Sequence, residues 1–349
     1  MRLVVLGLSL SSSWGNGHAT TFRALLSAFA ARGHDVLFLE RDVEWYRNHR
    51  DLPDPDFCRL QYYDSVPDLT RLSDEVASAD AVIVGSYVPD GVAVGRWAQA
   101  TATGPVAFYD IDTPVTLAKL ARGDHEYLSP ELIPGYDLYL SFTGGPTLTR
   151  LQDECGSPAA RALYCSVDPA RYRPTGGSKR WDVTYLGTWS ADRQPTLDRL
   201  LIEPARRAPD RRFAVAGPQY PGSIDWPANV ERIEHLPPAG HAAFYSASRF
   251  ALNVTRADMI AAGWSPSVRL FEAAACATPI ISDRWEGLGE LFPPGEAIIL
   301  ADTADDVLAA LEGDADAMGR AAQAIVLAGH TAAHRAAELE RYLEEVERH

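Results

Sequence analysis

The feature that most constrains the fold is an alternation of short apolar runs and helical patterns along the whole chain. Apolar runs of about four to eight residues predict buried strands, and longer stretches with apolar residues three and four apart predict helices. In the first half the predicted strands cover residues 3–8, 36–39, 81–84, 106–109 and 138–142. In the second half they cover 183–186, 212–216, 230–233, 250–254, 279–282 and 297–300. The alternation predicts an α/β fold with parallel sheets.

A turn-rich segment divides this series into two. Residues 171–180 read RYRPTGGSKR, with a proline, two adjacent glycines and four basic residues. Such a composition is typical of a linker. We therefore expect two Rossmann-like domains that face a central cleft, an N-terminal one over residues 1–166 and a C-terminal one over 181–330, joined by a linker over 167–180. Residues 331–349 contain a last amphipathic helix with apolar residues on one side.

Composition excludes several classes of function. The net charge of −15, from 47 acidic and 32 basic residues, argues against binding to nucleic acid or to anionic membranes. No apolar run approaches the ~20 residues that span a bilayer, and the four cysteines are scattered without the spacing of a zinc site. We expect a cytoplasmic protein without an integral membrane segment, and the sequence does not constrain its oligomeric state.

The loop after the first predicted strand reads SSSWGNGHATT, residues 11–21. It lacks the GxGxxG pattern that binds a dinucleotide, which disfavours a nicotinamide or flavin enzyme. Gly15 and Gly17 allow close approach of the backbone, and His18 lies at the start of a predicted helix. The helix dipole lowers the pKa of an imidazole there, so His18 is either a neutral base or an ordinary histidine of the capping region.

Two aspartates follow a later strand of the first half. The segment FYDIDTPVT, residues 108–116, places Asp110 and Asp112 at the carboxyl end of a strand, where open α/β sheets bind their ligands. An Asp-x-Asp pair can hold a divalent metal that carries a diphosphate. The arginines described next lie in the other half of the chain. We therefore favour orientation of His18 or recognition of an acceptor over metal binding.

Three strand-end segments of the second half form a candidate anion site. They read YLGTWSADRQ (185–194), AGPQYP (216–221) and LNVTRADM (252–259). Backbone amides after a strand and arginine side chains are common ligands of phosphate. In an acidic chain, arginines gathered at one sheet edge indicate an anion, and a diphosphate is the simplest candidate. The candidate residues in these loops are Gly187, Thr188, Arg193, Gln219 and Arg256.

The segment SVRLFEAAACATPII, residues 267–281, carries one charged pair in an apolar helix followed by a strand. Ser267 can cap the first turn. Arg269 and Glu272 lie three residues apart on the helix. A surface salt bridge, worth less than about 1 kcal/mol, is one interpretation of the pair, and a ligand site is the other.

Three motifs in order resemble the GT-B glycosyltransferases of group 1, the family 4-like enzymes. GNGHATTFRALLSAFAARGHDVLFLE (15–40) resembles their opening segment, and CSVDPARYRP (165–174) resembles their inter-domain signature. Residues 267–300 resemble the donor-site helix and the strand that follows it, and are most similar to the CgeB-like branch named for spore-maturation proteins. The chain departs from the family at Trp264, where the family 4 pattern has a glutamate that lies close to the transferred sugar.

The resemblance implies roles for the candidate residues. Glu272 would accept hydrogen bonds from the ribose of a nucleotide, and Arg269 would contact the diphosphate. The second domain would bind the donor and the first the acceptor, with the helix in 331–349 returning to the first domain. His18, oriented by Asp110 or Asp112, would act as the base of an inverting member, whereas a retaining member needs none. The candidate acceptor-binding residues are Trp14, Asn16, Gly17 and Tyr87.

These implications predict a hexosyltransferase-like enzyme that transfers a sugar from a nucleotide-diphosphate sugar to an unidentified acceptor. We expect it to need neither metal nor cofactor, because three arginines and a helix N-terminus can neutralise a diphosphate. Two alternatives remain open at this point. The chain could be a nucleotide-sugar epimerase of the same fold, or a nucleotide- or sugar-binding protein without catalysis.

Overall fold

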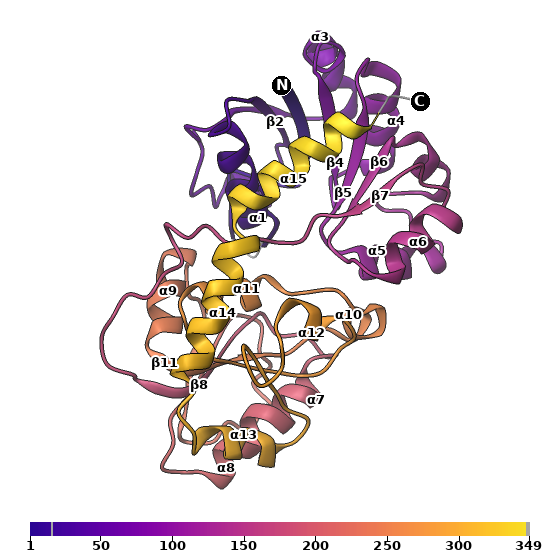
Figure 1. Cartoon of the computed structure of the whole chain (residues 1–349). Coiled ribbons are helices and arrows are strands. Elements are labelled where there is room, and N and C mark those ends of the chain that lie inside the picture. The colour runs from indigo at the N-terminus through magenta and orange to yellow at the C-terminus, as the bar shows by residue number, and fades with distance from the viewer. Residues whose placement is uncertain (15–16, 347–349) are drawn as a thin grey trace. The chain divides into compact units, whose positions relative to one another are not determined.

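The computed structural model of the chain describes residues 1–14 and 17–346. It consists of two compact units. The first comprises Met1–Ser166 together with the residues from Ala332 onward, and the second comprises Val167–Thr331. Each unit contains one parallel sheet with flanking helices, which confirms the predicted α/β fold (Figure 1).

The first unit is built on a seven-stranded parallel sheet with the order β3-β2-β1-β4-β5-β6-β7. Its strands are β1 (Arg2–Gly7), β2 (Asp35–Arg41), β3 (Arg59–Tyr63), β4 (Ala81–Gly85), β5 (Val106–Asp110), β6 (Leu138–Ser141) and β7 (Ala160–Ala162). Strands β1, β4 and β5 are almost entirely buried because helices cover both faces of such a sheet. The strand order reverses beside β1, whose neighbours are β2 on one side and β4 on the other.

Helices connect these strands and complete the core of the first unit. They are α1 (Gly17–Ala30), α2 (Glu44–Arg47), α3 (Ser73–Ala77), α4 (Gly91–Thr101), α5 (Thr113–Ala121), α6 (Pro146–Asp153) and the 3-10 helices at Val66–Leu72 and Pro130–Gly135. The helix α15 (Ala332–Glu345) belongs to this unit and packs along α1 (Figure 1). Its apolar side chains Ala336, Leu339 and Leu343 are buried there.

The second unit has a six-stranded parallel sheet with the order β10-β9-β8-β11-β12-β13. Its strands are β8 (Trp181–Leu186), β9 (Phe213–Ala216), β10 (Val230–Ile233), β11 (Ser248–Asn253), β12 (Ile280–Ser282) and β13 (Ile299–Leu300). Its helices are α7 (Gln194–Leu197), α8 (Glu203–Arg207), α9 (Pro238–Ser246), α10 (Ala257–Ala262), α11 (Val268–Ala275), α12 (Leu288–Leu291), α13 (Ala304–Leu311) and α14 (Asp316–Gly329), with a π-helical turn at Asp198–Ile202 between α7 and α8. Here the order reverses beside β8, between β9 and β11.

The structure differs from the sequence predictions in a few elements. Strands β3 and β7 were not predicted, because β3 is only partly buried and β7 has three residues, so neither forms an apolar run. Residues 167–180, predicted as a linker, lie in the second unit. Ser267 precedes α11 as its N-cap residue, but its side chain makes no capping hydrogen bond.

Candidate functional site

Both sheets place candidate residues at the point where the strand order reverses. The loops that leave the carboxyl ends of two strands separate there and expose backbone and side chains to a ligand. In the first unit these are the loops after β1 and β4, and in the second they are the loops after β8 and β11. The sequence-predicted residues therefore fall into two groups, one in each unit.

In the first unit His18 and Tyr87 are in contact. Their ring centres lie 5.1 Å apart with the rings perpendicular. Burial lowers the pKa of His18 from 6.5 to about 4, so the imidazole is neutral at neutral pH. We expected a lowered pKa from the helix dipole; the largest cause in the structure is burial.

Tyr87 links His18 to one of the two aspartates. Its hydroxyl donates a hydrogen bond to Oδ2 of Asp112 over 3.2 Å. Burial raises the pKa of Tyr87 far above its usual value, with the Asp112 charge acting in the same direction, so this hydroxyl keeps its proton and donates. Asp112 is thus the aspartate connected to His18 through a side chain.

Asp110 has a different environment. It is fully buried, and its carboxylate accepts hydrogen bonds from the hydroxyls of Tyr139 at 2.6 Å and Thr116 at 2.8 Å and from the backbone N–H of Asp112 at 3.2 Å. Burial raises the pKa of Asp110 to about 6, although these hydrogen bonds act in the opposite direction. Asp110 therefore fixes the start of α5, while Asp112 is the aspartate that can orient another side chain.

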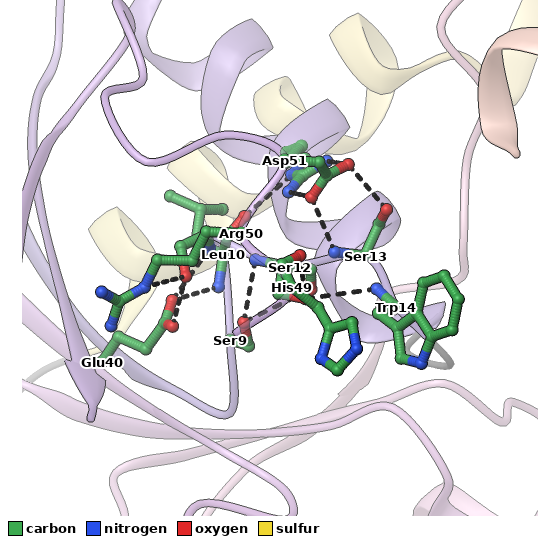
Figure 2. A network of polar contacts seen from close by, with 11 residues as sticks. Ser9, Leu10, Ser12, Ser13, Trp14, Glu40, His49, Arg50 and Asp51 are labelled. Atoms are coloured by element: carbon green, nitrogen blue, oxygen red, sulfur yellow. Dashed lines mark hydrogen bonds and ion pairs between the residues drawn. The ribbon is translucent and has the colours of Figure 1, made fainter. Parts of the chain in front are cut away.

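Glu40 holds the loop after β1 in place. This residue was not predicted from the sequence. Its buried carboxylate accepts hydrogen bonds from the N–H groups of Leu10 at 2.6 Å and Ser11 at 2.9 Å and from the Ser11 hydroxyl at 2.6 Å. Figure 2 shows this group beside the side chain of Arg50, which also donates to Ser11 Oγ at 3.3 Å. The signal in the sequence was a single glutamate within the apolar strand β2.

Of the remaining acceptor candidates the structure describes two, Trp14 in the loop after β1 and Gly17 at the start of α1. Trp14 is exposed, Gly17 is the first residue of α1, and Asn16 lies outside the described residues. The backbone around Trp14 is ordered by Ser12, whose hydroxyl accepts from the Trp14 N–H at 3.3 Å and donates to the His49 carbonyl at 2.8 Å (Figure 2). The ring of His49 stacks on the indole of Trp14.

In the second unit two glycines allow the loops after β8 and β9 to meet. A β-carbon on Gly217 would lie 2.1 Å from the carbonyl oxygen of Gly187, and one on Gly187 would lie 2.8 Å from Nη2 of Arg269. Gly217 also has a φ of 140°, a backbone conformation that residues other than glycine rarely adopt. The glycines therefore bring the backbone of this edge directly against the guanidinium of Arg269.

Arg269 is only 8% exposed. Its Nε donates to the carbonyl of Leu186 and its Nη1 donates to Oδ1 of Asn253 at 2.9 Å, so the last residues of β8 and β11 fix the guanidinium. The hydroxyl of Ser267 donates to the same Asn253 oxygen at 2.8 Å instead of capping the helix. Asn253 was not predicted; an amide at the end of an apolar strand was its only signal.

Glu272 is also buried, at 4% exposure, and binds other partners. Its Oε2 accepts a hydrogen bond from the Tyr245 hydroxyl at 3.1 Å, and Nδ1 of His241 lies 3.8 Å from the same oxygen. Tyr172, from the predicted inter-domain motif, contacts that Nδ1 through its hydroxyl at 3.2 Å. Arg269 and Glu272 are both buried and contact different groups. The interpretation of this pair as a surface salt bridge is therefore wrong.

The other two arginines lie near Arg269. Arg193 folds over its own loop and donates to the carbonyl of Thr188 at 2.6 Å and to Ser190 Oγ at 2.8 Å. Burial lowers the pKa of Arg193, and the charges of Arg269 and Arg256 act in the same direction, so Arg193 is close enough to both of the other cations to be repelled by them. Thr188 and Gln219 are exposed at this edge.

Arg256 is the least compensated member of the group. Its Nε is 3.9 Å from Oδ2 of Asp192, beyond hydrogen-bond distance, and has no hydrogen-bond partner within the part of the chain that the structure describes. The guanidinium of Arg269 lies over the ring of Tyr185, 4.7 Å from its centre, and the buried hydroxyl of this tyrosine likewise has no partner among those residues. Buried polar groups without partners are uncommon in proteins, so these two atoms are candidates for contact with a bound anion.

Within residues 1–14 and 17–346, no group of three or more His, Cys, Asp or Glu side chains is arranged to hold a metal ion. In the same residues, no helix has both the length and the apolar character needed to cross a membrane.

Comparison with known proteins defines the class of fold as GT-B. The chain is similar to sucrose-phosphate synthase from Thermosynechococcus elongatus with a TM-score of 0.73 at 15% identity, covering 99% of both chains. It is similar to Anabaena HepE in complex with UDP-glucose with a TM-score of 0.72 at 12% identity, covering 99% of this chain and 100% of that one. An alpha-glucosyltransferase in complex with UDP gives a TM-score of 0.71 at 12% identity with the same coverage.

A family match adds to the likeness in fold. Residues 193–341, which include Arg193, Arg256, Arg269 and Glu272, match the sequence profile of the family described as glycosyl transferase-like. No curated protein sequence matches the chain.

Proposed function

We propose that the protein is a glycosyltransferase that moves a hexose from a nucleoside diphosphate sugar to a hydroxyl group of an acceptor, without a metal ion. The observation that carries this proposal is the cluster of Arg193, Arg256 and Arg269 at the carboxyl edge of one parallel sheet in a chain of net charge −15. The cluster lies within the residues that match the glycosyl transferase-like family. UDP-glucose is the first donor to test, because HepE was solved with it.

In this proposal the second unit binds the donor. The arginines and the backbone amides after β8 bind the diphosphate, and Glu272 binds the ribose through the carboxylate that Tyr245 orients. Trp264, which replaces a glutamate of the resembled family, donates from Nε1 to Glu290 at 2.9 Å and so belongs to the packing of its loop. We also propose that, among these enzymes, the chain is most similar to the CgeB-like branch.

The first unit binds the acceptor and supplies the base. Neutral His18 takes the proton of the acceptor hydroxyl as its oxygen attacks the anomeric carbon of the sugar. The bond from that carbon to the diphosphate oxygen breaks, and the nucleoside diphosphate leaves with its charge balanced by the arginines. Asp112 orients His18 through Tyr87.

The proposal is tested by incubating the protein with UDP-glucose and other nucleoside diphosphate sugars and measuring free UDP or its counterpart. Release of the free diphosphate separates transfer or hydrolysis from epimerisation and from silent binding. In parallel, ligand at about 100 times its Kd adds roughly 2.7 kcal/mol of stability, which a thermal shift detects. If none of these compounds is bound or turned over, the proposed function is wrong.

Arg269 provides the variant for this test. Arg269→Ala removes a buried group that the carbonyl of Leu186 and Asn253 need, so its stability must be measured beside its affinity. Arg269→Lys keeps the positive charge but cannot donate two parallel hydrogen bonds as a guanidinium does. We expect it to weaken the binding of UDP by about tenfold. Arg284→Ala is the matched control, because Arg284 is an exposed arginine that pairs with Asp302 outside the cluster.

A further inference from the structure

An aromatic surface in the first unit suggests the class of acceptor. Trp14 is 42% exposed and Trp45 is 60% exposed, and among the described residues only four large hydrophobic side chains are exposed. Both indoles contact one histidine: the ring centres of Trp14 and His49 lie 4.8 Å apart at 17°, and those of Trp45 and His49 lie 5.5 Å apart at 42°. We call Trp14, His49 and Trp45 the aromatic platform.

The backbone holds this platform in place before any ligand arrives. Besides the contacts through Ser12, Asp51 accepts hydrogen bonds from the N–H of Ser13 at 2.9 Å and its hydroxyl at 2.7 Å (Figure 2). Arg23 donates to the same carboxylate from Nη1 at 3.0 Å and from Nη2 at 2.7 Å. Burial alone would raise the pKa of Asp51, but the bonds from Arg23 and Ser13 outweigh it and hold the pKa well below its usual range. A platform ordered in advance loses little entropy on binding.

His49 gives the platform a polar edge. Its Nδ1 lies 2.7 Å from the carbonyl oxygen of Trp45, and a carbonyl only accepts, so Nδ1 carries the hydrogen. In the neutral imidazole Nε2 then keeps its lone pair and accepts a hydrogen bond. The imidazole stacks on one face of Trp14 and is tilted against Trp45, so the exposed indole surface of both residues lies next to an acceptor nitrogen. This arrangement matches a ligand that presents C–H bonds on one face and hydroxyl groups at its rim. A pyranose ring has this chemistry.

Other occupants fit less well. The net charge of −15 repels nucleic acid and anionic lipid headgroups, and the guanidinium of Arg23 is already paired with the carboxylate of Asp51. The platform is also close along the chain to the proposed base, because Trp14 is four residues before His18 and their Cα atoms are at most about 14 Å apart. A ligand bound on the platform therefore lies in the neighbourhood of the proposed base.

We propose that Trp14, Trp45 and His49 bind a pyranose ring of the acceptor, so that the acceptor is a glycan or a glycoside. This inference rests on the proposed function, because it identifies the acceptor of that reaction. The exposed surface of the indoles packs against the C–H face of the ring, and His49 Nε2 accepts from one of its hydroxyl groups.

The test uses saturation-transfer NMR of the full chain with maltose, cellobiose and methyl α-D-glucopyranoside. We expect at least one of these sugars to bind, with the strongest transfer to protons of one ring face. Trp14→Ala and Trp45→Ala should each weaken that binding by about threefold to tenfold. Trp14→Tyr should retain most of it, since it keeps a stacking ring. Leu327→Ala, which truncates an exposed side chain at 43% exposure in the second unit, is the matched control.

The same variants are titrated with UDP to separate this inference from the proposed function. UDP affinity should be unchanged in all of them. If UDP binds while none of the three sugars does, or if the sugars bind equally well to the alanine variants, the aromatic platform is not an acceptor site and the proposed function stands. If neither UDP-glucose nor any other nucleoside diphosphate sugar tested is bound or turned over, the proposed function fails whatever the acceptor sugars do. Circular dichroism of each variant shows that a loss of binding is not a loss of fold.

Discussion

The hydroxyl of Tyr87 donates to Oδ2 of Asp112 over 3.2 Å, and the ring of the same tyrosine lies perpendicular to that of His18, with 5.1 Å between the ring centres. These side chains follow β4, β5 and β1, so the sheet alone brings them together. Tyr87 also has a φ of 62°, a left-handed conformation that costs a residue with a β-carbon roughly 1–2 kcal/mol. Strain of this kind is often found where a side chain has a function.

The first prediction concerns the rate. His18→Ala should leave UDP affinity within a few-fold and lower transfer by at least about 10², because it removes the base and leaves the second unit intact. Single-turnover kinetics with UDP-glucose and any acceptor found above measure this. Near-normal turnover would reduce His18 to a histidine of the helix start, the alternative that the sequence left open.

The pH dependence of the rate tests the same residue independently. With a pKa of about 4, His18 stays neutral and able to accept a proton down to about pH 5. Transfer by the wild-type protein should therefore change little between pH 7 and pH 5.5. An ordinary histidine with a pKa of about 6.5 would be roughly nine-tenths protonated at pH 5.5. A rate that falls with such a midpoint would contradict the buried, neutral imidazole.

The second prediction concerns the ribose. Glu272→Gln should weaken the binding of UDP by about tenfold or more and the binding of 2′-deoxy-UDP much less. The reason is that the variant loses a hydrogen bond between the charged carboxylate and the 2′-hydroxyl, which only UDP has. Tyr245→Phe removes the hydroxyl that holds Oε2 and should give a smaller loss with the same preference. Calorimetric titrations provide the affinities. Equal losses for the two nucleotides would show that Glu272 does not bind the ribose.

The third prediction concerns metal ions. Turnover of UDP-glucose should survive EDTA, because the arginine cluster supplies the positive charge that the leaving diphosphate needs. The rate is measured after chelation and again after magnesium or manganese is added. Loss of activity that either metal restores would make Asp112, with Asp110, the first residues to examine as ligands.

The fourth prediction concerns stability. The folded-state pKa of Asp110 is raised from 3.8 to about 6, so its stabilising contribution is complete below pH 3.8 and is lost as the pH rises through 6. Asp110→Asn cannot ionise, so the variant should gain about 3 kcal/mol relative to wild type between pH 4 and pH 7. Urea unfolding across this range measures the difference. Asp153→Asn, an exposed aspartate at the end of α6, should show no such gain, and an equally flat profile for Asp110→Asn would contradict the raised pKa.

Much of the fold could be predicted because its strands are buried on both faces and therefore appear as apolar runs. The arginine cluster could be predicted for a related reason, since residues after parallel strands meet at one edge whatever their distance in sequence. Strand β3 could not, because its partly buried residues alternate too weakly to form a run.

The hydrogen-bond partners of the candidate residues could not be predicted from the sequence. Nothing in the pattern around Asn253 indicates that it receives both Arg269 and Ser267. Asp110 and Asp112 look equivalent in sequence, and only the pleat of β5 and the turn into α5 give them different partners. Glu40 could have been found by the argument applied to Glu272, since each is a carboxylate in an apolar element and each proves to be buried.

The return of α15 to the first unit has a consequence for synthesis of the protein. The ribosome makes α15 only after the whole second unit, yet Ala336, Leu339 and Leu343 are buried in the first. Until then the nascent first unit lacks the partner of α1 and leaves apolar surface open to chaperones or to aggregation. The domain that emerges first is thus the last to be completed, and a stop codon just before residue 332 would harm the first unit more than the second.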